Sequence, residues 1–159
     1  MATSRYLSLS LNQTGIVIPD YTFTNYARDV AQYAAIGYTA TGVPTTKGLN
    51  YESKQIWQVT ALLDEQDMLT CRAIAHRSNE LRIAGSDPSI TIVDTCQQVL
   101  ETAPRTRALA PASAEIIWPT GEVAYYAVFK GWISDLKTPV QGRYYSVSIT
   151  VAETEKVAA

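Results

Sequence analysis

The sequence predicts an α+β protein that is mainly β: an antiparallel β-sandwich or partly open barrel with one amphipathic helix packed on the sheet. Near the C-terminus, Tyr145, Val147, Ile149 and Val151 alternate with small or hydroxyl-bearing residues. That period of two is typical of a strand with one buried face. The same alternation recurs upstream, and only one segment, near residues 65–79, changes to the period of a helix.

The N-terminal half contains several predicted strands. Alternating leucines predict a strand over Tyr6–Asn12, and a short extended piece follows over Ile16–Ile18. The segment Tyr21–Val30 is compatible with either a helical turn or a strand. From Tyr33 the alternation indicates a strand, and it does so again over Ile56–Leu63, where every second residue is large and apolar.

Two segments interrupt these patterns within what we predict to be a single domain, 1–159. Residues 41–53 contain glycine, proline and asparagine and are predicted to be a loop, longer than a typical connection and therefore a candidate contact element. Residues 102–114 include two prolines and five alanines without usable periodicity. We expect this second segment, centred on Ala103–Ser113, to be an irregular surface arm.

The helix is predicted from its start signal and its apolar stripe. Asp64 is a good N-cap, and Glu65 and Asp67 place negative charge where the helix dipole favours it. Met68 and Cys71 begin a row of residues at spacings of three and four that continues to Ser78. The narrow stripe predicts a helix over Glu65–Asn79 with one face on the sheet and the other in water.

The C-terminal half is predicted to be a strand, a brief helical turn over Gln97–Glu101, and then a meander. Glu115–Trp118 is expected to form a hairpin with Glu122–Trp132 across a Pro-Thr-Gly turn. Lys130-Gly131 is expected to mark a bulge, because an isolated glycine in a strand often does. Residues 134–142 are predicted to turn the chain into the last strand, and the end from Glu153 to Ala159 is expected to fray.

Composition excludes several classes of function. The net charge is −2 and no basic run is present, which disfavours nucleic-acid binding. Cys71 and Cys96 have neither CxxC nor metal-ligand spacing, so we expect free thiols and intracellular synthesis. The start lacks the apolar stretch of a signal peptide, and no run approaches the ~20 residues needed to span a bilayer. We therefore expect a soluble protein without a membrane partner.

No constellation for catalysis is recognisable. His76 is the single histidine, and Cys71, five residues earlier, lies on a different side of the predicted helix. No cluster has metal-ligand spacing, and no glycine-rich phosphate loop is present. A hydrolase that pairs Asp94 with another carboxylate is a weak alternative, because nothing brings two carboxylates together. We expect a protein that is not an enzyme and has no cofactor.

Three stretches together resemble phage tail proteins of the distal-tail or tail-tube type of β-sandwich with one packed helix. They are Tyr51–Val59 running into the capped helix Asp64–Ser78, the strand Ile90–Asp94, and Phe129–Ile133 followed by a loop and Gly142–Glu153. The resemblance is one of pattern and covers roughly residues 51–154. It implies a structural virion component of the tail or baseplate, made in the host cytoplasm.

The resemblance further implies assembly through sheet edges and loops into a homo-oligomeric ring or with other tail proteins. On that basis the expected contact residues lie in the long loop and in the arm: Thr41, Val43, Thr45, Lys47, Leu49, Tyr51, Arg105 and Arg107. The alternative is a monomeric carbohydrate- or ligand-binding β-sandwich. That function would require Trp57, Trp118 and Trp132 to be exposed together, whereas the strand pattern buries Trp57.

Overall fold

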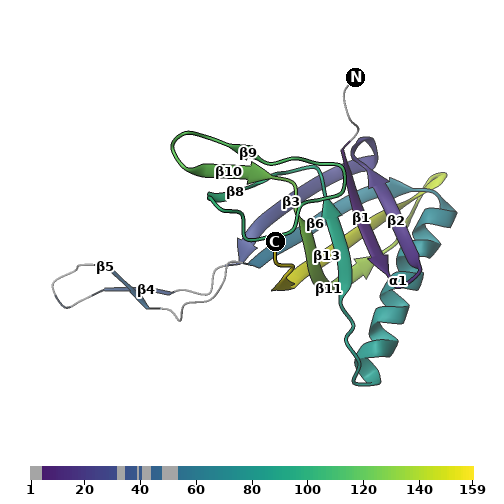
Figure 1. Cartoon of the computed structure of the whole chain (residues 1–159). Coiled ribbons are helices and arrows are strands. Elements are labelled where there is room, and N and C mark those ends of the chain that lie inside the picture. Colours follow the sequence, from purple (N-terminus) through teal and green to yellow (C-terminus); the bar gives the residue numbers. More distant parts are fainter. Residues whose placement is uncertain (1–4, 32–34, 39, 41–43, 48–53) are drawn as a thin grey trace.

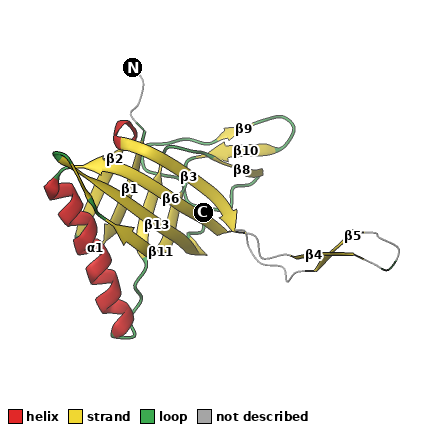
Figure 2. Cartoon of the chain, turned by 180° about the vertical axis from the view of Figure 1, so that it is seen from behind, coloured by secondary structure: helices red, strands yellow, loops and turns green. Residues whose placement is uncertain are grey.

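A computed structural model describes residues 5–31, 35–38, 40, 44–47 and 54–159, with side chains described for 5–29, 40 and 54–159. It consists of one long helix and a large curled antiparallel sheet, with a small three-stranded sheet beside it (Figures 1 and 2). The predicted class, α+β and mainly β, is confirmed.

The large sheet has the strand order β2-β1-β7-β11-β13-β6-β3, with β12 paired to β13. Its strands are β1 (Tyr6–Leu11), β2 (Thr14–Pro19), β3 (Phe23–Ala31), β6 (Lys54–Leu63), β7 (Ile90–Asp94), β11 (Val128–Lys137), β12 (Val140–Gln141) and β13 (Tyr144–Lys156). All pairings are antiparallel. The open question about residues 21–30 is answered: a short 3-10 turn, Asp20–Thr22, leads into strand β3.

One face of this sheet carries the hydrophobic core. The apolar residues that alternate in the sequence are the residues that are buried, since every second residue is buried in β6 and in the central part of β13. Trp57 of β6 lies opposite Val151 of β13 in the register between these strands. Trp57 also meets Phe129 edge to face, with ring centroids 4.8 Å apart. Because paired residues point to the same side of a sheet, the face opposite the core carries the hydroxyl and small residues of the same strands.

The helix α1 (Glu65–Ile83) is confirmed and is four residues longer than predicted. The side chain of Asp64 caps it, accepting a 2.8 Å hydrogen bond from the Asp67 N–H. Its buried stripe ends at Ser78, but the helix continues to Ile83. Gly85, two residues further on, has a φ of +75° that permits the left-handed turn after the helix. The helix packs on β2, β1, β11 and β13.

The small sheet has the order β8-β10-β9, formed by β8 (Val99–Thr102), β10 (Glu122–Tyr125) and β9 (Ile116–Ile117). The hairpin predicted between β9 and the following strand is confirmed. The strand predicted over Glu122–Trp132, however, is two strands: β10 belongs to the small sheet and β11 to the large one. Its alternate residues stay buried across the junction, from Val123 to Phe129.

The helical turn predicted over Gln97–Glu101 is wrong, because β8 occupies that position and pairs with β10. The arm Ala103–Ser113 is not a surface arm. Isolated bridges tie Arg107 to Ala158 and Leu109 to Ala127, and Arg107 is buried.

The C-terminus differs from the prediction in a related way. Strand β13 continues to Lys156 and buries Glu153, where fraying was expected. The turn expected over residues 134–142 is also shorter, because β11 extends to Lys137 and β12 pairs with β13. The bulge at Lys130-Gly131 is confirmed by a register shift.

The region predicted as a loop over residues 41–53 contains a strand. Strand β5 (Pro44–Lys47) pairs antiparallel with β4 (Ala35–Tyr38), which corresponds to part of the strand expected from Tyr33. Together they form a two-stranded sheet that stands apart from the large sheet (Figure 1). The loop prediction is therefore corrected at β5, and its remaining positions lie outside the described residues.

Candidate functional site

A buried polar cluster around Asp94 lies on the core side of the curled sheet. Asp94, at the end of β7, accepts hydrogen bonds at Oδ2 from the hydroxyl of Tyr26, from Arg28 Nη1 (2.8 Å) and from Trp57 Nε1 (3.0 Å). Its Oδ1 accepts from the Cys96 N–H (2.8 Å). Strands β7 and β3 are four positions apart in the sheet order, so only a strong curl can bring them together.

The charges of this cluster are internally compensated. Arg28 also donates to the carbonyl oxygens of Gln97 and Gln98, at 2.9 and 3.0 Å. Burial, reinforced by the nearby carboxylate of Asp94, raises the pKa of the Tyr26 phenol well above its ordinary value, which keeps it a hydrogen-bond donor. Only Arg28 Nε is buried without a hydrogen-bond partner among the polar atoms of this pair. A buried ion pair with this many further hydrogen bonds fixes geometry, so we assign the cluster a structural role.

A second buried ion pair joins the segment Ala103–Ser113 to the last strand, β13. Arg107 Nη2 lies 3.0 Å from Glu153 Oε1, and the Arg107 N–H donates to the hydroxyl of Tyr125. Arg28 and Arg107 each lie 5.5 Å from the ring centroid of Phe129. Cation–π contact of this kind favours guanidinium groups in an apolar interior, so the two ion pairs and the ring act as one unit.

The residues predicted to make contacts with other subunits lie in different surroundings in the structure. Arg105 pairs with Glu115 at 3.2 Å and lines a hollow of about 490 Å³ beside the small sheet, whereas Arg107 faces the interior. Thr45 and Lys47 lie on β5. The others, Thr41, Val43, Leu49 and Tyr51, lie outside the described residues. The structure therefore separates the two arginines that the sequence placed on one arm.

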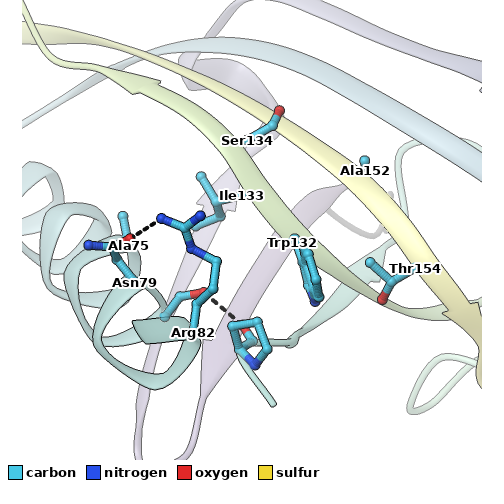
Figure 3. A pocket seen from close by; sticks show the side chains of 10 residues that line it. Ala75, Asn79, Arg82, Trp132, Ile133, Ser134, Ala152 and Thr154 are labelled. Carbon is cyan, nitrogen blue, oxygen red and sulfur yellow. Dashed lines mark hydrogen bonds between the residues drawn. The ribbon is translucent and has the colours of Figure 1, made fainter. Parts of the chain in front are cut away.

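A groove that the sequence analysis did not identify lies between the C-terminal half of α1 and strands β11 and β13. It has a volume of about 420 Å³. Figure 3 shows Asn79 and Arg82 on the helix side and Trp132 and Thr154 on the strand side. Its other lining residues are Ala75, Ser78, Pro88, Ile133, Ser134 and Ala152. Trp132 pairs with Ala152 in the register, so it lies on the face opposite the core.

The groove adjoins a smaller hollow of about 320 Å³, which shares Trp132 and Thr154 with it. There Lys130 Nζ lies between two carboxylates, 3.0 Å from Asp87 and 2.8 Å from Glu155. Hydrogen bonds from Ser89 and Lys130 lower the pKa of Asp87 to about 2. The one ammonium offsets only one of the two carboxylates, so this hollow keeps a net negative charge, but among the described residues neither carboxylate forms an ion pair with Arg82.

The geometry offers little for catalysis within the described residues. His76 is exposed and pairs with Glu80 at 2.9 Å, one turn further along α1. Burial raises the pKa of the Cys71 thiol to about 12, so that thiol is not a nucleophile at neutral pH. Among the described residues no group of His, Cys, Asp and Glu side chains is placed to hold a metal ion. In the same part of the chain, no helix combines the length and the apolarity needed to cross a membrane.

Comparison with known proteins leaves the family open. No model of a known protein family matches the chain, and no curated protein matches it either.

Proposed function

We propose that this protein is a structural component of a phage tail or baseplate that assembles into a ring of identical copies or with other tail proteins. The observation that carries the proposal is the β4–β5 hairpin. Among the described strands β4 and β5 pair only with each other, and they stand away from the body of the molecule (Figure 1). An extended hairpin of this kind gains partners most readily by contacting another subunit. In this proposal the protein is made in the host cytoplasm and resides in the tail of the virion.

The edges of the large sheet support the same proposal. Strands β2 and β3 end the strand order, and each has a single described neighbour. An edge strand presents unpaired backbone groups that can pair with another chain, and closure of a ring removes such edges. The edge strands and the projecting hairpin thus give each subunit two kinds of surface that can contact a neighbouring subunit.

The small sheet adds apolar surface to these contacts. Leu100 and Ile116 are both register partners of Ala124, so they share its face, and both side chains are largely exposed. Ile117 and Trp118 are exposed at the same edge. Exposed apolar residues in such a group are typical of protein-protein contact surfaces.

A hairpin deletion tests the proposal. Ala31 and Lys54 are directly opposite each other in the β3–β6 register. Replacing residues 32–53 with Asn-Gly should therefore close β3 and β6 by a tight turn and leave the body folded. We expect the full chain to form rings or larger assemblies by light scattering and electron microscopy, and the deletion variant to be a folded monomer.

Leu69→Lys is the matched control, since Leu69 is exposed on α1 and belongs to neither the hairpin nor the edge strands β2 and β3. This variant should assemble as the unmodified chain does. A full-length protein that is monomeric at every concentration and binds no tail protein would contradict the proposal. Assembly that survives removal of the hairpin would contradict the role given to β4 and β5.

The alternative carbohydrate-binding function, as it was framed from three exposed tryptophans, is not supported. Trp57 is 1% exposed and donates its indole N–H to Asp94. Trp118 and Trp132 lie in different places, one after β9 and one on β11.

A further inference from the structure

The indole ring of Trp132, in the groove beside α1, has a fixed orientation. Its indole Nε1 donates to the hydroxyl of Ser89 at 3.2 Å, which satisfies the polar end of the ring and fixes its orientation. The side chain is nevertheless 44% exposed, and it borders both the groove and the adjoining hollow. A single exposed tryptophan is unremarkable, but a fixed ring whose remaining surface is apolar and forms the wall of a cavity is suited to stacking.

The opposite wall supplies a cation and an amide. Arg82 Nη2 donates to Asn79 Oδ1 at 2.5 Å, so the two side chains are held together. Among the described residues, no carboxylate forms an ion pair with Arg82. The remaining N–H groups of the guanidinium can therefore receive a carboxylate, and the amide nitrogen of Asn79 remains a donor.

Two hydroxyl groups complete the rim. Ser134 donates to the carbonyl oxygen of Thr150, and Thr154 donates to that of Lys130. Because their protons are engaged by the backbone, their oxygens can serve a further group only as acceptors. The groove thus offers a stacking surface, donors on one side and acceptors on the other, in a volume of about 420 Å³, within the ~300–1,000 Å³ of small-molecule sites.

We propose that this groove binds a saccharide that carries a carboxylate, of the uronic-acid type. The apolar face of a sugar ring lies on Trp132, its hydroxyl groups donate to Ser134 and Thr154 and accept from Asn79, and its carboxylate pairs with Arg82. This inference does not rest on the proposed assembly, because the residues that carry it lie outside the β4–β5 hairpin and the edge strands β2 and β3.

The competing occupant is an acidic peptide. Strand β7 pairs with β11 only as far as Gly131, so β11 has no β7 neighbour alongside the groove. A peptide strand would use that backbone and would gain little from the hydroxyl groups of the rim, which belong to side chains. Four hydrogen-bonding side chains around one fixed ring favour the saccharide.

The test is calorimetric titration of the full chain with a galacturonic acid tetramer, a neutral glucose tetramer and a tetraglutamate peptide. We expect saturable binding of the uronate, with the neutral tetramer and the peptide each at least about tenfold weaker. Trp132→Ala should abolish uronate binding, whereas Trp118→Ala, at a tryptophan that is 42% exposed and outside the groove, should not change it.

Arg82→Gln separates recognition of charge from folding, because it changes a surface side chain. It should weaken uronate binding about tenfold and leave the weak binding of the neutral tetramer unchanged. Arg77→Gln, with the same loss of charge but outside the groove, should have no effect. Absence of saturable uronate binding, equal binding of the neutral tetramer, equal binding of tetraglutamate, or an undiminished affinity in Trp132→Ala would each overturn the proposal.

Discussion

Replacing Asp94 with asparagine should strongly destabilise the fold, although the two side chains have nearly the same shape. The carboxylate of Asp94 is fully buried and accepts from four donors, one of which is the buried guanidinium of Arg28. An asparagine places an NH2 group against some of those donors and leaves Arg28 without its counter-charge. Removing one partner of a buried ion pair typically costs ~3–5 kcal/mol.

We expect the lower end of that range, about 3 kcal/mol, because Arg28 keeps its hydrogen bonds to two backbone carbonyls. Urea unfolding followed by tryptophan fluorescence measures the change. The double variant Asp94→Asn with Arg28→Met should lose less stability than the sum of the two single variants, by about 1 kcal/mol or more, because the orphaned charge is gone.

Glu80→Gln serves as the control, since its partners His76 and Arg77 are on the exposed face of α1. It should change the free energy of unfolding by no more than about 0.5 kcal/mol. A cost below about 1 kcal/mol for Asp94→Asn, or strict additivity in the double variant, would refute the idea that this ion pair holds the curl of the sheet.

Three further predictions concern packing, thiol reactivity and pH. Gly131→Ala should cost about 1–3 kcal/mol in urea unfolding, because its Cβ would lie 2.4 Å from the backbone oxygen of Ala152 on the facing strand. At Gly15 the nearest atom to an added Cβ is the Ser10 Cβ at 3.3 Å and the nearest backbone atom is at 3.5 Å, so Gly15→Ala should cost less. Burial raises the pKa of both the Cys71 and the Cys96 thiol to about 12. A disulfide reagent at neutral pH should therefore react with these thiols far more slowly in the native protein than in urea. Rapid reaction of either thiol in the native protein would contradict this prediction. Partial burial opposes ionisation of Glu101, but hydrogen bonds from neighbouring groups lower its pKa below the ordinary 4.5. The contribution of Glu101 to stability is therefore present above pH 4.5 and is lost as the pH falls through the lowered pKa. Glu101→Gln should make the free energy of unfolding less dependent on pH in this acidic range, and an unchanged pH dependence would contradict the prediction.

The sequence was sufficient for elements whose pattern is local. The two-residue period of β6 and β13 and the capped stripe of α1 each depend on neighbours along the chain, and each was predicted correctly. Errors occurred where charged residues were interpreted as solvent-exposed. Arg107 lies in the interior because Glu153, 46 residues away, neutralises it. No local pattern contains that partner.

The groove could not be predicted for a similar reason. Its walls come from α1, β11 and β13, and their proximity depends on how the helix lies against the sheet. The sequence does hold one signal, a tryptophan at Trp132 on the polar side of a strand whose preceding alternate residues, Phe129 and Gly131, are buried. That signal indicates an exposed aromatic ring, but it cannot indicate the cavity beside it.

The short connection between β10 and β11 has a mechanical consequence. Val123 and Tyr125 anchor the chain under the small sheet, and Phe129, two residues beyond the junction, anchors it in the middle of the large one. A load applied to the small sheet is thereby transmitted along a single backbone to a strand with neighbours on both sides. Such a strand separates from its neighbours only when several of its interstrand hydrogen bonds break together. The connection between the two sheets is therefore stiff under tension.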